Sequence, residues 1–300
     1  MTTLSGYHLG FIGLGLMGRP MCLHLHKAGA RLTIHNRSRA VVEQLIGPGI
    51  EAADKPAEVA RQADIVVMMV SDTPAVEQVL FGPDGLVGGL QAGSLVIDMG
   101  TTAAMATRDF AHRLQQAGAD LVDAPVSGGQ IGARDATLAI MAGGTDAAIA
   151  RALPLFEVLG KTFTHVGEVG AGQVAKAANQ VIVGLTIGAV AEALALADSA
   201  GVDMAKVREA LLGGFAASRV LEVHGQRMID ESFAPGGKST TQHKDLRQAL
   251  DLGASHGLSL PATELNLNLY QALIDQGDGA LDHSALFKLI RKTAGSSEKE

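Results

Sequence analysis

Short apolar runs alternate with segments of helical periodicity over the first half of the chain. The first run, residues 8–13, leads directly into glycines, and a helix is predicted from Pro20 to Gly29. Strands that alternate with helices in this way predict right-handed crossovers and a doubly wound, mostly parallel sheet. The further predicted strands are Arg31–His35, Ile65–Val70, Leu95–Asp98, Leu121–Ala124 and Leu138–Ala142, with helical segments at 56–62, 74–80 and 103–117 between them.

The pattern changes to helical periodicity at about residue 166. A long, apolar helix is predicted over residues 170–201, and shorter helices follow at 202–212, 220–228, 244–255 and 261–276. This shift predicts an α/β domain over residues 1–166 and an all-α domain over residues 167–300, joined by the long helix. The last residues, GSSEKE, are expected to form a polar tail.

Composition narrows the class of protein. The 300 residues are 47% hydrophobic and carry a net charge of −7, which suits a globular protein and disfavours nucleic acid as a partner. Cys22 is the only cysteine, so an internal disulfide and a cysteine-based zinc site are excluded. The uncharged run between Lys176 and Glu192 is shorter than the roughly 20 residues that span a bilayer, so we predict a buried helix and no membrane partner. The N-terminus lacks the pattern of a secretory signal, and a cytoplasmic location is expected.

A glycine-rich segment follows the first predicted strand and opens the first predicted helix. Its sequence is Gly13-Leu14-Gly15-Leu16-Met17-Gly18, a G-x-G-x-x-G motif. The first glycine permits a tight turn, the second lets the backbone approach a pyrophosphate, and the third allows close contact between helix and strand. The alternative is a purely structural glycine turn. In this position the motif predicts a Rossmann domain that binds a dinucleotide.

The end of the second predicted strand bears on the choice of cofactor. NAD-specific sites usually carry an acidic residue there, whereas this chain has Asn36, Arg37 and Ser38. Arg37 and Ser38 could hold a 2′-phosphate, which favours NADP over NAD. The alternative is a solvated loop. Val70, at the end of a later strand, is also expected beside the cofactor.

Two segments carry candidate catalytic chemistry. Ser127, Gly128 and Gly129 follow a predicted strand, where exposed N–H groups and a hydroxyl could bind a carboxylate, although an ordinary turn has the same sequence. Lys176 lies on the long apolar helix, three residues before Asn179, and could stabilise and protonate an oxygen that gains charge during hydride transfer. The alternative for Lys176 is a lysine that reaches solvent along the helix surface.

Other polar residues give weaker signals. Lys244 and Asp245 form a second lysine–acid pair, which on a surface helix would usually be solvated. The ten histidines show no metal-ligand spacing, so no metal site is predicted, and His224, His243, His256 and His283 are interpreted as structural or exposed. No G-x-S-x-G segment supports a hydrolase.

Four segments together give the chain a family resemblance. GFIGLGLMGRPM, DAPVSGG, GAGQVAKAANQ and HKDL occur in the order and spacing of the β-hydroxyacid dehydrogenases, and the chain resembles that family from about His8 to Leu289. The resemblance implies that Lys176 is the catalytic acid or base and that Ser127, Gly128, Gly129 and Asn179 hold the substrate. It also implies that Lys244 and Thr101 lie near the nicotinamide and its ribose.

The resemblance implies hydride transfer between NADP(H) or NAD(H) and a small 3-hydroxy acid or its semialdehyde. LGGFAASRVL and LDHSAL look most similar to the branch of the family that acts on tartronate semialdehyde. The chain departs from the family in GGQIGARDATL, residues 128–138, which includes the last two glycines of DAPVSGG, and in Gly100, where many relatives carry serine. Three alternatives stay open. The substrate could be 3-hydroxyisobutyrate, 4-hydroxybutyrate or threonate. The reaction could be imine reduction, which related enzymes perform without a lysine at position 176, or the chain could be a non-catalytic module that binds nicotinamide. The apolar helical half is expected to form a homodimer or homotetramer.

Overall fold

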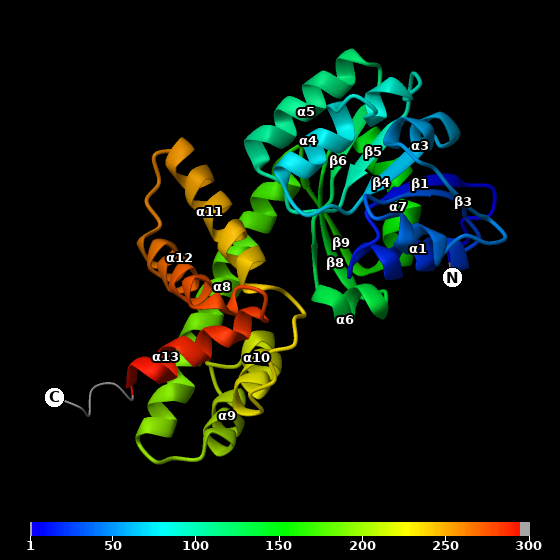
Figure 1. Ribbon diagram of the computed structural model, residues 1–300. Coiled ribbons are helices and arrows are strands. Elements are labelled where there is room, and N and C mark those ends of the chain that lie inside the picture. The colour runs from blue at the N-terminus through cyan, green and yellow to red at the C-terminus, as the bar shows by residue number, and fades with distance from the viewer. Residues whose placement is uncertain (1, 295–300) are drawn as a thin grey trace. The chain divides into compact units, whose positions relative to one another are not determined.

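The computed structural model describes residues 2–294 and divides the chain into two compact units (Figure 1). The division lies between Lys176 and Ala177, inside the long helix. The domain boundary predicted at residues 166 and 167 stays a prediction, and the predicted polar tail, residues 295–300, lies outside the described residues.

The first unit contains a nine-stranded sheet. Its order is β3-β2-β1-β4-β5-β6-β8-β7, with β9 paired to β8. The first six strands in the chain are parallel, β8 runs antiparallel to β6 and β7, and β9 is parallel to β8. This order confirms the predicted doubly wound sheet. The strands are β1 (His8–Ile12), β2 (Arg31–His35), β3 (Ile50–Ala52), β4 (Ile65–Met68), β5 (Leu95–Asp98), β6 (Asp120–Asp123), β7 (Val126–Ser127), β8 (Leu138–Gly143) and β9 (Gly160–Gly167).

Helices cover both faces of this sheet, because its central strands are apolar on both sides. In β4, Ile65 and Val67 enter one hydrophobic core while Val66 and Met68 enter the other. The first core packs against α1 and α7 and the second against α3, α4 and α5, as Figure 1 shows. The helices of this unit are α1 (Gly18–Lys27), α2 (Arg39–Glu43), α3 (Pro56–Gln62), α4 (Thr73–Phe81), α5 (Ala104–Gln116), α6 (Gly129–Arg134) and α7 (Asp146–Leu159).

The second unit is helical, as predicted, and its described residues contain no strand. The long helix α8 (Ala171–Ser199) begins in the first unit and supplies Ile187 and Leu194 to the core of the second. A neighbouring cluster of buried side chains includes Leu246 and Tyr270. The other helices are α9 (Met204–Leu212), α10 (Arg219–Ile229), α11 (Ser239–Ser255), α12 (Pro261–Leu273) and α13 (Leu286–Ala294).

Helix α8 is long and apolar enough to cross a membrane by length and composition alone. Its most apolar window has a mean hydropathy of 1.9, and 44% of that window is buried inside the protein. Two glutamines of this helix, Gln173 and Gln180, are buried and hydrogen-bonded to protein groups. Buried amides that pair within the protein are typical of a core helix, which agrees with the prediction made from the sequence.

Candidate active site

The glycine motif forms a tight turn between β1 and α1. Gly13 has a φ of 97°, which favours glycine, and a Cβ on Gly18 would lie 1.8 Å from the carbonyl oxygen of Gly13. A Cβ on Gly15, in contrast, would meet nothing within 4 Å. The first and third glycines therefore allow close packing, while the second faces open space, as a backbone that receives a pyrophosphate requires.

The start of α1 is suited to an anion. Met17 occupies the N-cap without a side-chain hydrogen bond to the helix, and the first turn holds no acidic residue. Asn36 connects this turn to the end of β2, because its Oδ1 accepts a hydrogen bond from the N–H of Leu14 at 3.0 Å and its Nδ2 donates to the carbonyl of Ser38. Arg37 is exposed between them. These residues fit a dinucleotide that extends from the glycine turn to the end of β2.

Val70 and Thr101 continue the same edge of the sheet. A Cβ on Gly13 would lie 3.1 Å from a methyl group of Val70, and one on Gly100 would lie 2.8 Å from the Val70 carbonyl oxygen. Thr101 is the next residue along the chain and is partly exposed. The structure therefore places Val70 between the glycine turn and the segment that carries Thr101.

Lys176 is buried, and its ammonium group contacts the end of the sheet. The side chain is 8% exposed, and Nζ donates a hydrogen bond to the carbonyl oxygen of Val126 at 2.9 Å. Val126 precedes Ser127 in β7, so the ammonium group lies beside the predicted carboxylate-binding segment. Gly128 and Gly129 have φ values of 132° and 59°, which explains the two glycines after Ser127. The interpretation of Lys176 as a solvated surface lysine is wrong, because the side chain is buried.

The second unit connects the two remaining predicted site residues through a polar network. Asn179 donates to the side chain of Gln180 at 2.8 Å, and Gln180 donates to Asp245 at 2.6 Å. Lys244 forms an ion pair with Asp245 at 3.0 Å. Asp245 is only 3% exposed. The interpretation of Lys244 and Asp245 as a solvated pair is therefore wrong for Asp245. Gln180 and Asp245 were not predicted as site residues, because only the packing of α8 against α11 brings them together.

Folding also brings together His224, Asp282 and His283, whose potential ligand atoms lie within 4.8 Å of one another. The spacing in the sequence gave no sign of this group. The Asp282 oxygens already accept hydrogen bonds from backbone N–H groups, including that of Gly236 at 2.9 Å, and Arg227 lies 3.0 Å away. Burial opposes ionisation of Asp282, but the two imidazoles, the Ser284 hydroxyl and the N–H of Gly236 hold its pKa well below its usual range. We interpret this group as a structural anchor for the chain around Gly236.

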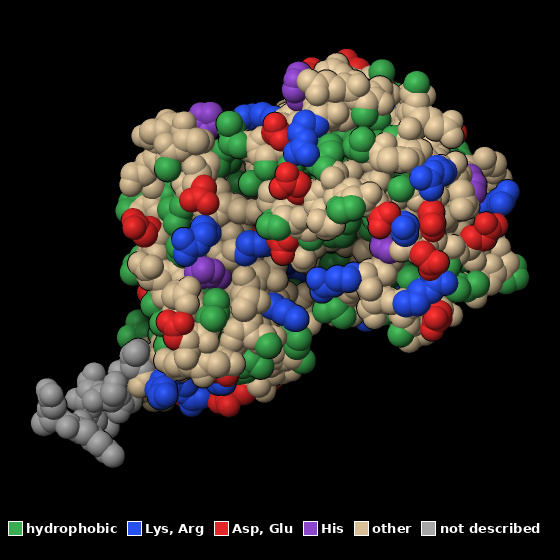
Figure 2. Space-filling view, turned by 45° about the horizontal axis from the view of Figure 1, so that its top comes forward, with side chains coloured by type: hydrophobic (Ala, Val, Ile, Leu, Met, Phe, Trp, Pro, Cys, Tyr) green, Lys and Arg blue, Asp and Glu red, His purple; other side chains and the backbone are tan. Residues whose placement is uncertain are grey.

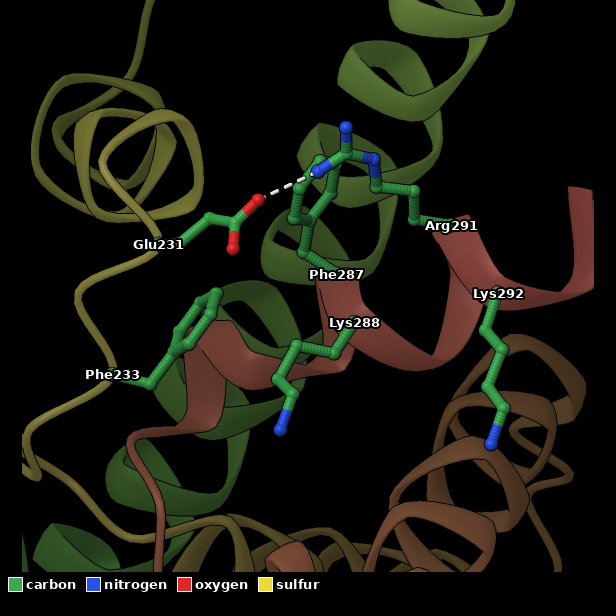
Figure 3. A pocket seen from close by; sticks show the side chains of 6 residues that line it. All are labelled: Glu231, Phe233, Phe287, Lys288, Arg291 and Lys292. Atoms are coloured by element: carbon green, nitrogen blue, oxygen red, sulfur yellow. Dashed lines mark hydrogen bonds and ion pairs between the residues drawn. The ribbon is translucent and has the colours of Figure 1, made fainter. Parts of the chain in front are cut away.

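The second unit also contains a pocket of about 260 Å³ that none of the predicted site residues lines (Figure 3). Arg291 at its edge is paired with Glu231 and Asp198, both at 2.7 Å, and Lys288 is paired with Asp278. Figure 3 shows Phe233 and Phe287 on its walls. Since two of its cations have acidic partners, this pocket is a poor candidate for the carboxylate site.

Charged side chains of both signs are interspersed on the face shown in Figure 2. Lys and Arg lie singly or in small groups, with Asp and Glu between them. Among the residues that the structure describes, the face shown therefore lacks the extended cationic patch that is typical of a surface that binds a polyanion.

Comparisons with known proteins agree with the two-part organisation. Residues 8–167 match the family model described as the NAD-binding domain of 6-phosphogluconate dehydrogenase. Residues 170–290 match the model described as NAD-binding of NADP-dependent 3-hydroxyisobutyrate dehydrogenase.

Individual relatives extend over nearly the whole chain. The 2-hydroxy-3-oxopropionate reductase of Escherichia coli is 46% identical over 286 residues, which cover 95% of this chain and 98% of that protein. A solved 3-hydroxyisobutyrate dehydrogenase from Salmonella typhimurium superposes with a TM-score of 0.86 at 28% identity and covers 94% and 99% of the two chains. A solved complex of Psf3 with NADP+ and 2-OPP gives a TM-score of 0.85 at 26% identity, with coverage of 94% and 99%.

These matches confirm the resemblance and the predicted class of enzyme. The glycine turn and the α1 N-terminus fit the nicotinamide dinucleotide that such enzymes use. The chain therefore belongs to the β-hydroxyacid dehydrogenase family and is an NAD(P)-dependent oxidoreductase.

Proposed function

We propose that this enzyme reduces a small semialdehyde that carries a carboxylate, with tartronate semialdehyde (2-hydroxy-3-oxopropionate) as its substrate. The observation that carries the proposal is the hydrogen bond from Lys176 Nζ to the carbonyl of Val126, which holds a buried ammonium group next to Ser127. A cation beside an anion-binding turn suits a substrate with a carboxylate at one end and a reacting carbonyl nearby.

In this proposal the residues after β6 and β7 bind and orient the substrate. The Ser127 hydroxyl and the N–H groups of Gly128 and Gly129 donate hydrogen bonds to the substrate carboxylate, and Asn179, three residues after Lys176, also donates to the substrate. The reduced nicotinamide, when bound, supplies hydride to the aldehyde carbon. Lys176 stabilises the negative charge that develops on the aldehyde oxygen and donates a proton to it, and it accepts that proton in the reverse direction.

NADP is the proposed cofactor. Arg37 and Ser38 are exposed next to Asn36, which is hydrogen-bonded to the glycine turn, so both can approach a 2′-phosphate at the end of β2. A guanidinium group and a hydroxyl are suitable donors to a phosphate, whereas this segment lacks the acidic residue that binds the free ribose in NAD-specific sites.

The identity of 46% to a 2-hydroxy-3-oxopropionate reductase favours that substrate over others used in the family. A panel of tartronate semialdehyde, 3-hydroxyisobutyrate, succinic semialdehyde and threonate tests this choice of substrate. Absorbance follows the consumption of NADPH or NADH with the aldehydes and the reduction of the oxidised cofactors with the hydroxy acids. We expect the highest kcat/KM for tartronate semialdehyde with NADPH. A higher value for another member of the panel would reject the substrate, and turnover of none of them would reject the function.

We further propose a cytoplasmic enzyme that forms a homodimer or homotetramer through its helical half. Large apolar side chains are exposed on helices of this unit, with Ile182 and Leu196 of α8 and Leu265 of α12 each more than 60% exposed. Contact with a second copy would remove these side chains from water, which favours association. Light scattering coupled to size-exclusion chromatography measures the mass, and a monomer at micromolar concentration would reject the oligomer.

A further inference from the structure

A buried carboxylate lies where the helix that carries Lys176 begins. Asp123 at the end of β6 is completely buried, and its Oδ1 accepts a hydrogen bond from the N–H of Gly170 at 2.7 Å. Its Oδ2 accepts one from the N–H of Gln173 at 2.8 Å. The first N–H groups of a helix have no partner within the helix, so Asp123 acts as the cap of α8 although it is remote in sequence.

The packing around this carboxylate leaves no room for a side chain at two neighbouring glycines. A Cβ on Gly172 would lie 2.5 Å from the carbonyl oxygen of Asp123 and 2.8 Å from its Oδ2. A Cβ on Gly143, at the end of β8, would lie 2.6 Å from Oδ1 of the same carboxylate. The two glycines therefore allow the first turn of α8 and the end of β8 to approach Asp123 directly.

A second connection links the same turn to the segment that carries Thr101. The side chain of Gln173 accepts a hydrogen bond from the N–H of Thr102 and donates one to the carbonyl of Gly100, both at 3.0 Å. The Thr102 hydroxyl in turn donates to Asp98 at the end of β5. The start of α8 is thus attached to the ends of both β5 and β6, one turn before Lys176.

We propose that Asp123 is a positioning residue for Lys176: its carboxylate fixes the first turn of α8 and thereby holds the lysine ammonium group against Val126. The proposal rests on the proposed function only for its effect on catalysis. The hydrogen bonds of Asp123 to the N–H groups of Gly170 and Gln173 connect the carboxylate to Lys176 through the backbone of this helix. A misplacement of a reacting group by about 1 Å can lower a rate by about 100-fold, so even a small shift of this turn matters.

The test compares Asp123→Asn with wild type in two independent measurements. An amide offers only one acceptor oxygen to the two N–H groups, so hydrogen–deuterium exchange of the peptide covering residues 170–176 should accelerate at least tenfold. The kcat with the best substrate should fall about 10- to 100-fold. The Kd for NADPH should stay within about twofold, because the glycine turn is unchanged.

A matched control separates positioning from the general loss of a helix cap. Asp203 caps α9 by accepting from the N–H of Ala205 at 2.8 Å, so Asp203→Asn makes the same chemical change at another helix start. It should leave kcat and the exchange of residues 170–176 unchanged. If Asp123→Asn does not fold, Asp123→Ser, whose hydroxyl can accept from one of the two N–H groups, takes its place with the same expected results.

Unchanged exchange or unchanged kcat in the Asp123 variant would overturn the proposal, as would a change limited to KM. Failure of both variants to fold would also overturn it, because the carboxylate would then serve the stability of the whole unit rather than the place of Lys176. If the Asp123 variant shows faster exchange but the wild type reduces no semialdehyde, the proposed function is rejected. The role of Asp123 in fixing the start of α8 is then kept.

Discussion

At the scale of single residues, the first unit buries three ionisable groups near the ends of its central strands. Asp98, Asp123 and Lys176 are each less than 10% exposed, and each makes hydrogen bonds to the backbone or to a hydroxyl. Burying a charged group costs free energy unless hydrogen bonds compensate for the lost hydration. For Asp123, burial is accompanied by a raised pKa, and perturbed pKa values of this kind are common at functional sites.

Asp123 gives a prediction about pH. Burial raises its pKa to about 7, above the 3.8 of an unperturbed aspartate, although the N–H groups of Gly170 and Gln173 favour the ionised form. The contribution of Asp123 to the free energy of unfolding is therefore full below pH 3.8. It is lost as the pH rises through 7, and the loss amounts to up to about 4 kcal/mol. Thermal unfolding of wild type and Asp123→Asn at pH 5 and pH 8 measures it. We expect the Tm of wild type, relative to the variant, to be lower at pH 8 than at pH 5, and an equal difference at both would contradict the assignment.

Arg37 gives a prediction about the cofactor. Loss of a hydrogen bond to a charged group costs about 1.5–3 kcal/mol, so Arg37→Ala should lower kcat/KM for NADPH relative to NADH by about 10- to 100-fold. The matched control is Arg39→Ala, because the Arg39 guanidinium is already paired with Asp54. The control should change the ratio by less than about twofold. An equal effect of both substitutions would show that Arg37 has no specific contact with the 2′-phosphate.

The individual site residues differ in how far the sequence could predict them. Lys176 and Ser127 belong to short segments whose composition indicates chemistry, and so they could be named without a structure. Asp123 also lies in one of these segments, but its role depends on two N–H groups about 50 residues away. Gln173 and Asp245 likewise depend on hydrogen-bond partners that are remote in the sequence, and only the tertiary structure brings these partners into contact.

At the scale of elements, the contact between α8 and the sheet depends on the absence of a side chain at position 172. Adding a methyl group to a tightly packed site costs about 1–3 kcal/mol, so Gly172→Ala should lower the Tm by several degrees. Gly213→Ala is the control, because a Cβ there would meet its nearest neighbour at an ordinary 3.5 Å. Differential scanning calorimetry of both variants tests the contact, and equal Tm values would contradict it.

The regular elements of the first unit were predictable because their periodicity is strong. The central strands are continuous apolar runs, and α4 and α5 lie within a residue of their predicted bounds. Among the elements that were not predicted, β7 has two residues and α6 contains two glycines, which are typical of a turn. The strands β3 and β9 and the helices α2, α7 and α13 were also not predicted. Helix α11 begins at Ser239 rather than Lys244, because hydrogen bonds from Ser239 to the chain near Asp282 outweigh the low helix propensity of its Ser-Thr-Thr start.

At the scale of the whole molecule, the change from α/β to all-α sequence predicted two parts, and the structure divides into two units. The predicted site residues fall into both: the glycine turn, Thr101, Ser127 and Lys176 lie in the first, and Asn179 and Lys244 lie in the second. The point of division could not be predicted from composition, because α8 is one continuous helix. Its first residues are assigned to the first unit, where Asp123 and Val126 bind them.

The proposed reduction depends on Lys176 as the proton donor. The most direct test is the single-turnover rate of Lys176→Met with NADPH and tartronate semialdehyde, measured together with the Kd for NADPH. Loss of a general acid lowers the rate by about 10²- to 10⁴-fold, and the Kd should stay within about twofold because the glycine turn is intact. A variant that keeps a near-normal rate would contradict the proposed chemistry.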